Sequence, residues 1–115
     1  MENGFYAIED TGKNEFRWST NRCSMVLTNM TDAPIKVTFR SGVLCGNDKE
    51  ATLEVLNGGA VISTMQIKDK MSSIEVELEL QPGDNEIVFQ TDAEQVDAPG
   101  DGRALFLRWY GINVY

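Results

Sequence analysis

The chain has 115 residues, 42% of them hydrophobic and 24% charged, which is the size and composition of a single globular domain spanning residues 1–115. Ten basic against 18 acidic residues give a formal net charge of −8, and such a surface repels nucleic acid and anionic membranes, so neither is an expected partner. The absence of histidine excludes His-based catalytic dyads and zinc sites with imidazole ligands.

Apolar and polar residues alternate with a period of two over much of the chain, which predicts strands with one buried face. In chain order, we expect strands at residues 5–9, 22–29, 35–41, 51–56, 60–67, 74–80, 86–90 and 104–115. Turn-forming stretches rich in Asn, Asp, Gly and Pro separate several of these runs. About eight short antiparallel strands predict an all-β sandwich of jelly-roll or immunoglobulin-like topology.

The sequence also predicts the position or state of several individual residues in these strands. Glu75, Glu77 and Glu79 alternate with aliphatic residues and should face solvent. Gly111 interrupts the last strand and should mark a bulge or a bend between sheets. Cys23 and Cys45 lack a CxxC spacing and are interpreted as buried thiols, although a bridge between them stays open.

The N-terminal residues are polar and lack the basic and apolar regions of a signal peptide, so none is expected. No apolar run is long enough to span a membrane, and no membrane insertion is expected. The cysteine pattern leaves the compartment open, because buried thiols and a bridge favour different redox environments.

Catalysis finds little support in the sequence. Carboxylates are numerous, but nothing marks a pair of them as buried, and no nucleophile motif or glycine-rich phosphate loop is present. We therefore predict a protein that is not an enzyme, with no catalytic residue, cofactor or metal. Oxygen ligands for Ca²⁺ are available, but without EF-hand spacing they are interpreted as solvated turn residues: Asp84, Asn85, Asp92, Asp97 and Asp101.

Aromatic side chains suggest a different role, because the flat C–H faces of sugars stack on aromatic rings while Asp, Asn and Arg bind the hydroxyls. Trp109 shares a strand face with Leu105 and Leu107, so it is interpreted as a core residue. Core packing is also the favoured interpretation of Trp18. The candidate ligand-binding residues are aromatic or lie beside aromatic residues and turn acids: Tyr6, Arg17, Trp18, Asp101, Arg103, Arg108, Tyr110 and Tyr115.

Both ends of the chain contain short motifs. The sequence GFYAIE at 4–9, followed by FRWS at 16–19, resembles the start of β-sandwich modules appended to bacterial glycosyltransferases and other polysaccharide-assembly proteins. The sequence GDGRALF at 100–106 resembles a signature near the end of these modules, with Gly102 where proline is usual. LQPGDNEI at 80–87 resembles the turn and strand that precede their final loop.

The resemblance implies an accessory, non-catalytic domain related to glycan synthesis or binding. In such a domain Arg17, Trp18, Asp101 and Arg103 either contact sugar or fasten the first strands to the last loop. The expected partners are an oligosaccharide or polysaccharide and a parent glycan-active enzyme. The module would be cytoplasmic on a glycosyltransferase and extracellular on a polysaccharide-degrading enzyme. The alternative function is protein interaction or oligomerisation without sugar binding.

Overall fold

The structure is a computed structural model that describes residues 2–10, 12, 15–46, 49–68, 70–96, 100 and 102–115. The described residues form eight strands: β1 (Glu2–Asp10), β2 (Glu15–Asn29), β3 (Ile35–Cys45), β4 (Ala51–Asn57), β5 (Ala60–Ile67), β6 (Ser72–Leu80), β7 (Gly83–Thr91) and β8 (Leu107–Val114). Every pairing between them is antiparallel. The predicted all-β class and the number of strands are confirmed.

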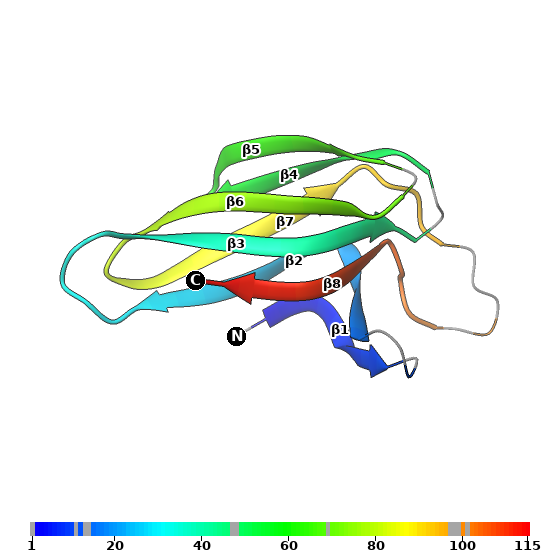
Figure 1. The fold of residues 1–115 in the computed structure, drawn as a ribbon, viewed down its shortest axis with the longest axis horizontal. Coiled ribbons are helices and arrows are strands. Elements are labelled where there is room, and N and C mark those ends of the chain that lie inside the picture. The colour runs from blue at the N-terminus through cyan, green and yellow to red at the C-terminus, as the bar shows by residue number, and fades with distance from the viewer. Residues whose placement is uncertain are drawn as a thin grey trace.

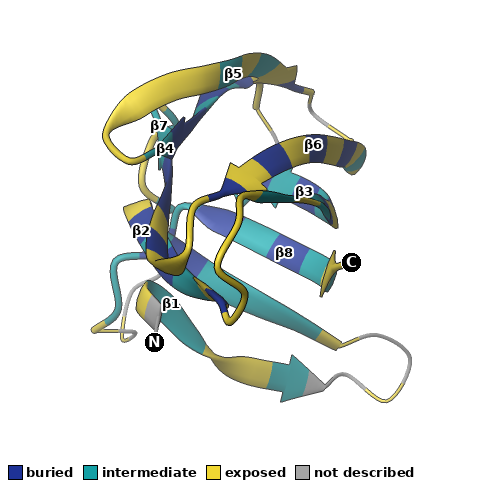
Figure 2. Cartoon of the chain, turned by 90° about the vertical axis from the view of Figure 1, so that its left-hand side faces the viewer, coloured by how far each residue is buried: buried dark blue, intermediate teal, exposed yellow. Residues whose placement is uncertain are grey.

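The strands form one sheet in the order β5-β4-β7-β2-β8-β3-β6, and β1 pairs with β2 beside this path. Figures 1 and 2 show that the sheet folds over into two facing layers, with β5, β4 and β7 in one and β8, β3 and β6 in the other. The free edges β5 and β6 lie at the side opposite to β1. The architecture is therefore the predicted β-sandwich, closed along one side by β2.

The alternation seen in the sequence matches the burial of the strands. Along β6, four aliphatic side chains are buried while the three intervening glutamates are exposed, as the banding in Figure 2 shows. Across the sheet, Glu75 pairs with Arg40 at 2.7 Å and Glu77 with Lys36 at 3.5 Å. These exposed ion pairs contribute little free energy, so the apolar face of β6 accounts for its place in the sandwich.

The core between the layers is built around three aromatic rings. Phe39 and Phe89 lie 4.8 Å apart between ring centroids, and Trp109 lies 5.1 Å from Phe89. Trp109 is 1% exposed, which confirms its interpretation as a core residue. The side chains of Cys23 and Cys45 are buried in the same core as thiols.

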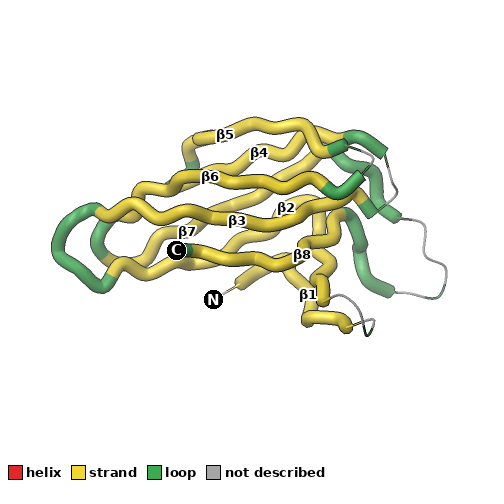
Figure 3. The backbone as a smooth tube through the Cα atoms, viewed as in Figure 1, coloured by secondary structure: helices red, strands yellow, loops and turns green. Residues whose placement is uncertain are grey.

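β2 closes the sandwich because it belongs to both layers (Figure 3). Its residues 17–19 pair with β8, and its residues 22–29 pair with β7. Ser19 lies at the change of partner and is fully buried. Its hydroxyl accepts a hydrogen bond from Trp109 Nε1 at 2.8 Å and donates to the Thr20 carbonyl at 3.1 Å, while its own carbonyl accepts from the Phe106 amide at 3.0 Å.

Several strand bounds differ from the prediction. β2 begins at Glu15 instead of residue 22, β3 continues to Cys45, and β8 begins at Leu107 instead of residue 104. Residues 15–21 carry large or amphipathic side chains on both faces, so their pattern has no clear alternation. Ala104 and Phe106 form loop hydrogen bonds with Tyr6, Ser19 and Gly46 in place of a regular strand pairing.

Replacing Ser19 by alanine should destabilise the domain, because the buried Trp109 N–H would lose its acceptor. We expect the free energy of unfolding to fall by about 1–3 kcal/mol, the usual cost of an unsatisfied buried donor. Urea denaturation followed by Trp fluorescence measures this change. Ser63→Ala, at a half-buried position in the edge strand β5, is the control. Equal stability of the two variants would contradict the role assigned to Ser19.

Candidate functional site

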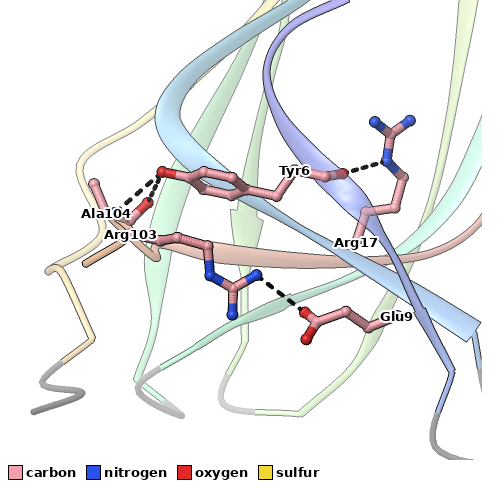
Figure 4. Close-up of polar contacts among 5 residues, drawn as sticks. All are labelled: Tyr6, Glu9, Arg17, Arg103 and Ala104. Atoms are coloured by element: carbon pink, nitrogen blue, oxygen red, sulfur yellow. Dashed lines mark hydrogen bonds and ion pairs between the residues drawn. The ribbon is translucent and has the colours of Figure 1, made fainter. Parts of the chain in front are cut away.

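Three of the predicted site residues meet beside β1 (Figure 4). The Tyr6 hydroxyl accepts a hydrogen bond from the Ala104 amide at 3.1 Å and donates to the Ala104 carbonyl at 3.3 Å. Arg17 Nε donates to the Tyr6 carbonyl at 2.8 Å. The guanidinium of Arg103 lies 5.5 Å from the centre of the Tyr6 ring, and its Nη1 lies 3.4 Å from Glu9 Oε2. We call these five residues the Tyr6 cluster.

The Tyr6 cluster connects β1, β2 and the segment that precedes β8. The Tyr6 hydroxyl and carbonyl bind other parts of the chain, so these groups are engaged within the protein. The Arg17 guanidinium also lies 5.2 Å from the Phe5 ring, which joins the cluster to the core. Asp101, predicted to act with these residues, lies outside the described part of the chain.

Three other predicted residues gather on the outer face of β2 and β8. Trp18 and Arg108 are cross-strand partners, and the guanidinium lies 5.4 Å from the centre of the indole ring. Phe16 contacts Trp18 edge-to-face at 6.3 Å and lies 5.5 Å from Tyr110. All four side chains are half-buried. We call Phe16, Trp18 and Tyr110, together with Arg108, the aromatic row.

Trp18 therefore differs from the sequence interpretation, which favoured a place in the core. It lies on the face opposite to Trp109 and covers the loop after β3 instead. A Cβ atom at Gly46 would lie 2.4 Å from Trp18 Cζ3 and 2.5 Å from Val96 Cγ2, so this approach requires glycine. The close packing fixes one side of the indole ring and leaves the residue half-buried.

A hollow of about 270 Å³ lies beside β1 and meets the aromatic row at Phe16. Its lining combines aromatic, aliphatic and charged residues: Ile8, Glu15, Phe16, Arg17, Trp109, Gly111 and Ile112. We call it the first hollow. An aromatic ring, a carboxylate and a guanidinium around one hollow provide both stacking and hydrogen bonding to a polar ligand.

Tyr115 lies apart from the other predicted residues. It is 61% exposed, and its ring lies 5.4 Å from the guanidinium of Arg40. The hydrogen bond and the charge of Glu75 raise the pKa of Arg40 above its ordinary value, so this residue keeps its charge. These residues border a second hollow of about 440 Å³, lined by Arg40, Ser41, Gly42, Ser73, Ile74, Glu75, Gly111, Asn113 and Tyr115.

The candidate calcium ligands fill structural roles where they are described. Asp84 accepts a hydrogen bond from Thr28 at 2.7 Å, and Asp92 accepts one from the Thr52 amide at 2.7 Å. Asn85 is buried and bonds across its own turn. Asp97 lies outside the described residues, like Asp101. Within the described part of the chain, no three His, Cys, Asp or Glu side chains are grouped to hold a metal ion, and no helix is long and apolar enough to cross a membrane.

Sequence reasoning missed Phe16, Glu15 and Gly111 as parts of a site. Phe16 is two residues from Trp18, so both rings lie on one face if this segment is a strand. The two-residue spacing of Phe16 and Trp18 could have revealed this shared face, but residues 15–21 were not predicted to be a strand. Gly111 was expected to form a bulge, and the register of β8 against β3 shifts at this point, which confirms the bulge.

No family model matches the chain, and no curated protein matches it. Solved structures share its fold. The C-terminal domain of EclA, a sugar-binding protein, has a TM-score of 0.56 and 12% identity over 80% of this chain and 64% of its own. A family 35 carbohydrate binding module from an environmental isolate has a TM-score of 0.55 and 16% identity over 98% of this chain and 90% of the module.

A family two carbohydrate esterase from Clostridium thermocellum, solved in complex with cellohexaose, has a TM-score of 0.55 and 13% identity over 98% of this chain. The chain spans less than two thirds of the EclA domain and 30% of the esterase. At these identities the likeness shows a common fold. It does not transfer site residues, because one fold carries many different sites.

Tyr6→Phe should release the segment before β8 from β1, because both hydrogen bonds to Ala104 are lost. We expect faster hydrogen exchange at the Ala104 amide and a loss of about 1 kcal/mol in the free energy of unfolding. NMR-detected exchange and urea denaturation measure the two effects. Tyr110→Phe leaves the contacts of Ala104 in place and serves as the control. Unchanged exchange at Ala104 in Tyr6→Phe would show that the cluster does not hold this segment.

Proposed function

We propose that this chain is a non-catalytic carbohydrate-binding module whose site is the aromatic row and the first hollow. The observation that carries the proposal is a row of three half-buried aromatic rings, one of which, Phe16, also lines the hollow that contains Glu15 and Arg17. Aromatic rings stack on the C–H faces of sugar rings, and carboxylate and guanidinium groups bind pairs of hydroxyls.

The arrangement of the aromatic row favours binding without large rearrangement. Its rings contact one another, and Trp18 packs closely against Gly46, which Val96 also contacts. Side chains that are ordered before binding lose little conformational entropy when the ligand arrives. With a net charge of −8, the domain is suited to a neutral glycan more than to an anionic one.

The first hollow supports binding without hydrolysis. Glycoside hydrolysis ordinarily needs two carboxyl groups on opposite sides of the scissile bond. The described lining of the first hollow contains one carboxylate, Glu15. The similarity of fold to a sugar-binding protein and a carbohydrate binding module agrees with this assignment.

The proposal extends to a parent polypeptide that acts on polysaccharide. The fold is shared with parts of larger carbohydrate-active enzymes, including an endo-β-1,4-mannanase and a carbohydrate esterase, of which the chain spans 20% and 30%. A polysaccharide-degrading parent, and with it an extracellular location, fits these neighbours better than the glycosyltransferase parent implied by the sequence resemblance.

A second candidate function, protein interaction, is favoured by the free edge strand β5. Its eight residues carry no charge, and Val61 and Ile62 are 51% and 44% exposed. Uncharged edge strands are prone to pair with another chain. Light scattering distinguishes the candidates, because self-association through β5 gives a mass above 12.8 kDa that grows with concentration.

Tyr110→Ala should weaken sugar binding, because it removes one ring of the aromatic row without touching the core. We expect a glycan-array screen to give at least one neutral glycan, and its affinity to fall on the order of tenfold in this variant. Titration against Trp fluorescence measures the change, and Ile62→Ala on the remote edge strand is the control. A folded protein that binds no glycan, or a Tyr110→Ala variant with unchanged affinity, would refute the proposed site.

A further inference from the structure

Three polar side chains form one row on the outer face of β8, β3 and β6. Arg40 on β3 is the cross-strand partner of Asn113 on β8 and of Glu75 on β6. All three residues are exposed and line the second hollow. Cross-strand partners lie on the same face, so an amide, a guanidinium and a carboxylate stand side by side and offer both donors and acceptors. We call these three residues the polar row.

The middle residue of the polar row is held in place by two neighbours. Arg40 Nε and Nη2 each lie 2.7 Å from Glu75 Oε2, and the guanidinium carbon lies 5.4 Å from the centre of the Tyr115 ring. The backbone of Tyr115 is also fixed, because its amide and carbonyl form hydrogen bonds with Thr38 at 3.0 and 2.7 Å. An exposed aromatic ring thus lies beside an ordered guanidinium before a ligand arrives, which lowers the entropic cost of binding.

The second hollow is separate from the aromatic row and from the first hollow. A Cβ atom at Gly42 would lie 2.9 Å from Met71 Sδ and 3.5 Å from Tyr110 Cβ, so the Met71 side chain covers Gly42 beside Tyr110. This side chain bounds the second hollow toward the aromatic row. Gly111 lines both hollows, but the first hollow continues to Trp109, which belongs to the core side of β8. A ligand in one hollow therefore leaves the other one open.

The charges and the size of the second hollow indicate the class of its ligand. The opposite charges of Arg40 and Glu75 balance, and the further glutamates of β6 and the net charge of −8 disfavour an anion. Its volume of about 440 Å³ lies within the roughly 300–1,000 Å³ usual for small-ligand sites. Sugar hydroxyls both donate and accept hydrogen bonds, and sugar C–H faces stack on aromatic rings, so a neutral sugar satisfies the polar row and Tyr115 together.

We propose that the second hollow is a second, independent binding site for a neutral sugar, which stacks on Tyr115 and forms hydrogen bonds with the polar row. This inference rests on the proposed function for the nature of the ligand and adds a separate site to it. Because the two sites open on different sides of the domain, one domain can hold two sugar units of the same polysaccharide or of two chains. Linked binding of this kind gives a higher affinity for a polymer than either site has alone.

The two sites can be followed separately in ¹H–¹⁵N NMR spectra. The Arg40 Nε–H and Asn113 side-chain amide signals report on the second hollow, and the Trp18 indole signal reports on the aromatic row. The probes are cellotriose, β-1,4-mannotriose and β-1,3-galactotriose, each titrated into the whole chain. At least one probe should shift the Arg40 and Asn113 signals with saturation. Tyr115→Ala should weaken this binding on the order of tenfold and leave the Trp18 titration unchanged.

Two cations on β3 provide a matched pair of variants. Arg40 and Lys36 are both exposed, and each forms an ion pair with a glutamate of β6. Arg40→Met and Lys36→Met therefore remove the same charge and a similar ion pair from the same face of the same strand. Arg40→Met should abolish the shift of the Asn113 signal, whereas Lys36→Met should keep it. Equal loss in both variants would attribute the effect to surface charge and overturn the assignment of the site.

The outcomes distinguish this inference from the proposed function. If the Trp18 signal shifts while the Arg40 and Asn113 signals do not, the second site is wrong although sugar binding stands. The second site is also wrong if Tyr115→Ala and Arg40→Met both leave the Asn113 titration unchanged. If the Arg40 and Asn113 signals shift while Trp18 does not, the second site stands and the site at the aromatic row is wrong. If no signal shifts with these probes or with any glycan found on the array, both are wrong.

Discussion

The change of partner along β2, fixed by the hydrogen bond between Trp109 and Ser19, is the constraint on which the rest of the structure depends. A buried indole N–H needs an acceptor, and Ser19 provides one at the residue where β2 leaves β8 and turns toward β7. The bond joins the two layers at their closed side. Because β2 continues into the second layer, its N-terminal part offers a pairing edge to β1.

The same constraint creates the candidate site. With Ser19 facing inward, Phe16 and Trp18 lie on the outer face, where β8 adds Arg108 and Tyr110. The Tyr6 cluster then holds β1 beside this face and brings Ile8 to the first hollow. The core and the aromatic row thus lie on opposite faces of the same short stretch of β2.

The fold was largely predictable because its strands alternate regularly. The pattern of β6 fixed its buried face, and the position of Trp109 beside Leu105 and Leu107 placed it in the core. Residues 15–21 were not predicted as a strand, because this segment has large side chains on both faces and lacks the alternation on which such predictions depend.

The candidate site was only partly predictable, because it depends on cross-strand register. Arg17, Trp18, Asp101 and Arg103 were expected to act together. Arg17 and Arg103 both contact Tyr6, whereas Trp18 lies with Arg108. Tyr115, another candidate, lies with Arg40 in a different hollow. Gly111 was expected to mark a bulge or bend, but its place in the lining of two hollows depends on the register of β8 against β3, which no local pattern encodes. The solved structures of similar fold are 12–16% identical and give no residue-level guide either.

The central claim is that sugar binds at the aromatic row and the first hollow, and the two tryptophans of the chain provide a direct test. Their indole N–H signals can be followed in ¹H–¹⁵N NMR spectra while the best glycan from the array is added. The account predicts that both signals shift with saturation, because Trp18 belongs to the aromatic row and Trp109 lines the first hollow. Saturable binding with a stationary Trp18 signal would contradict it and place the ligand on another surface.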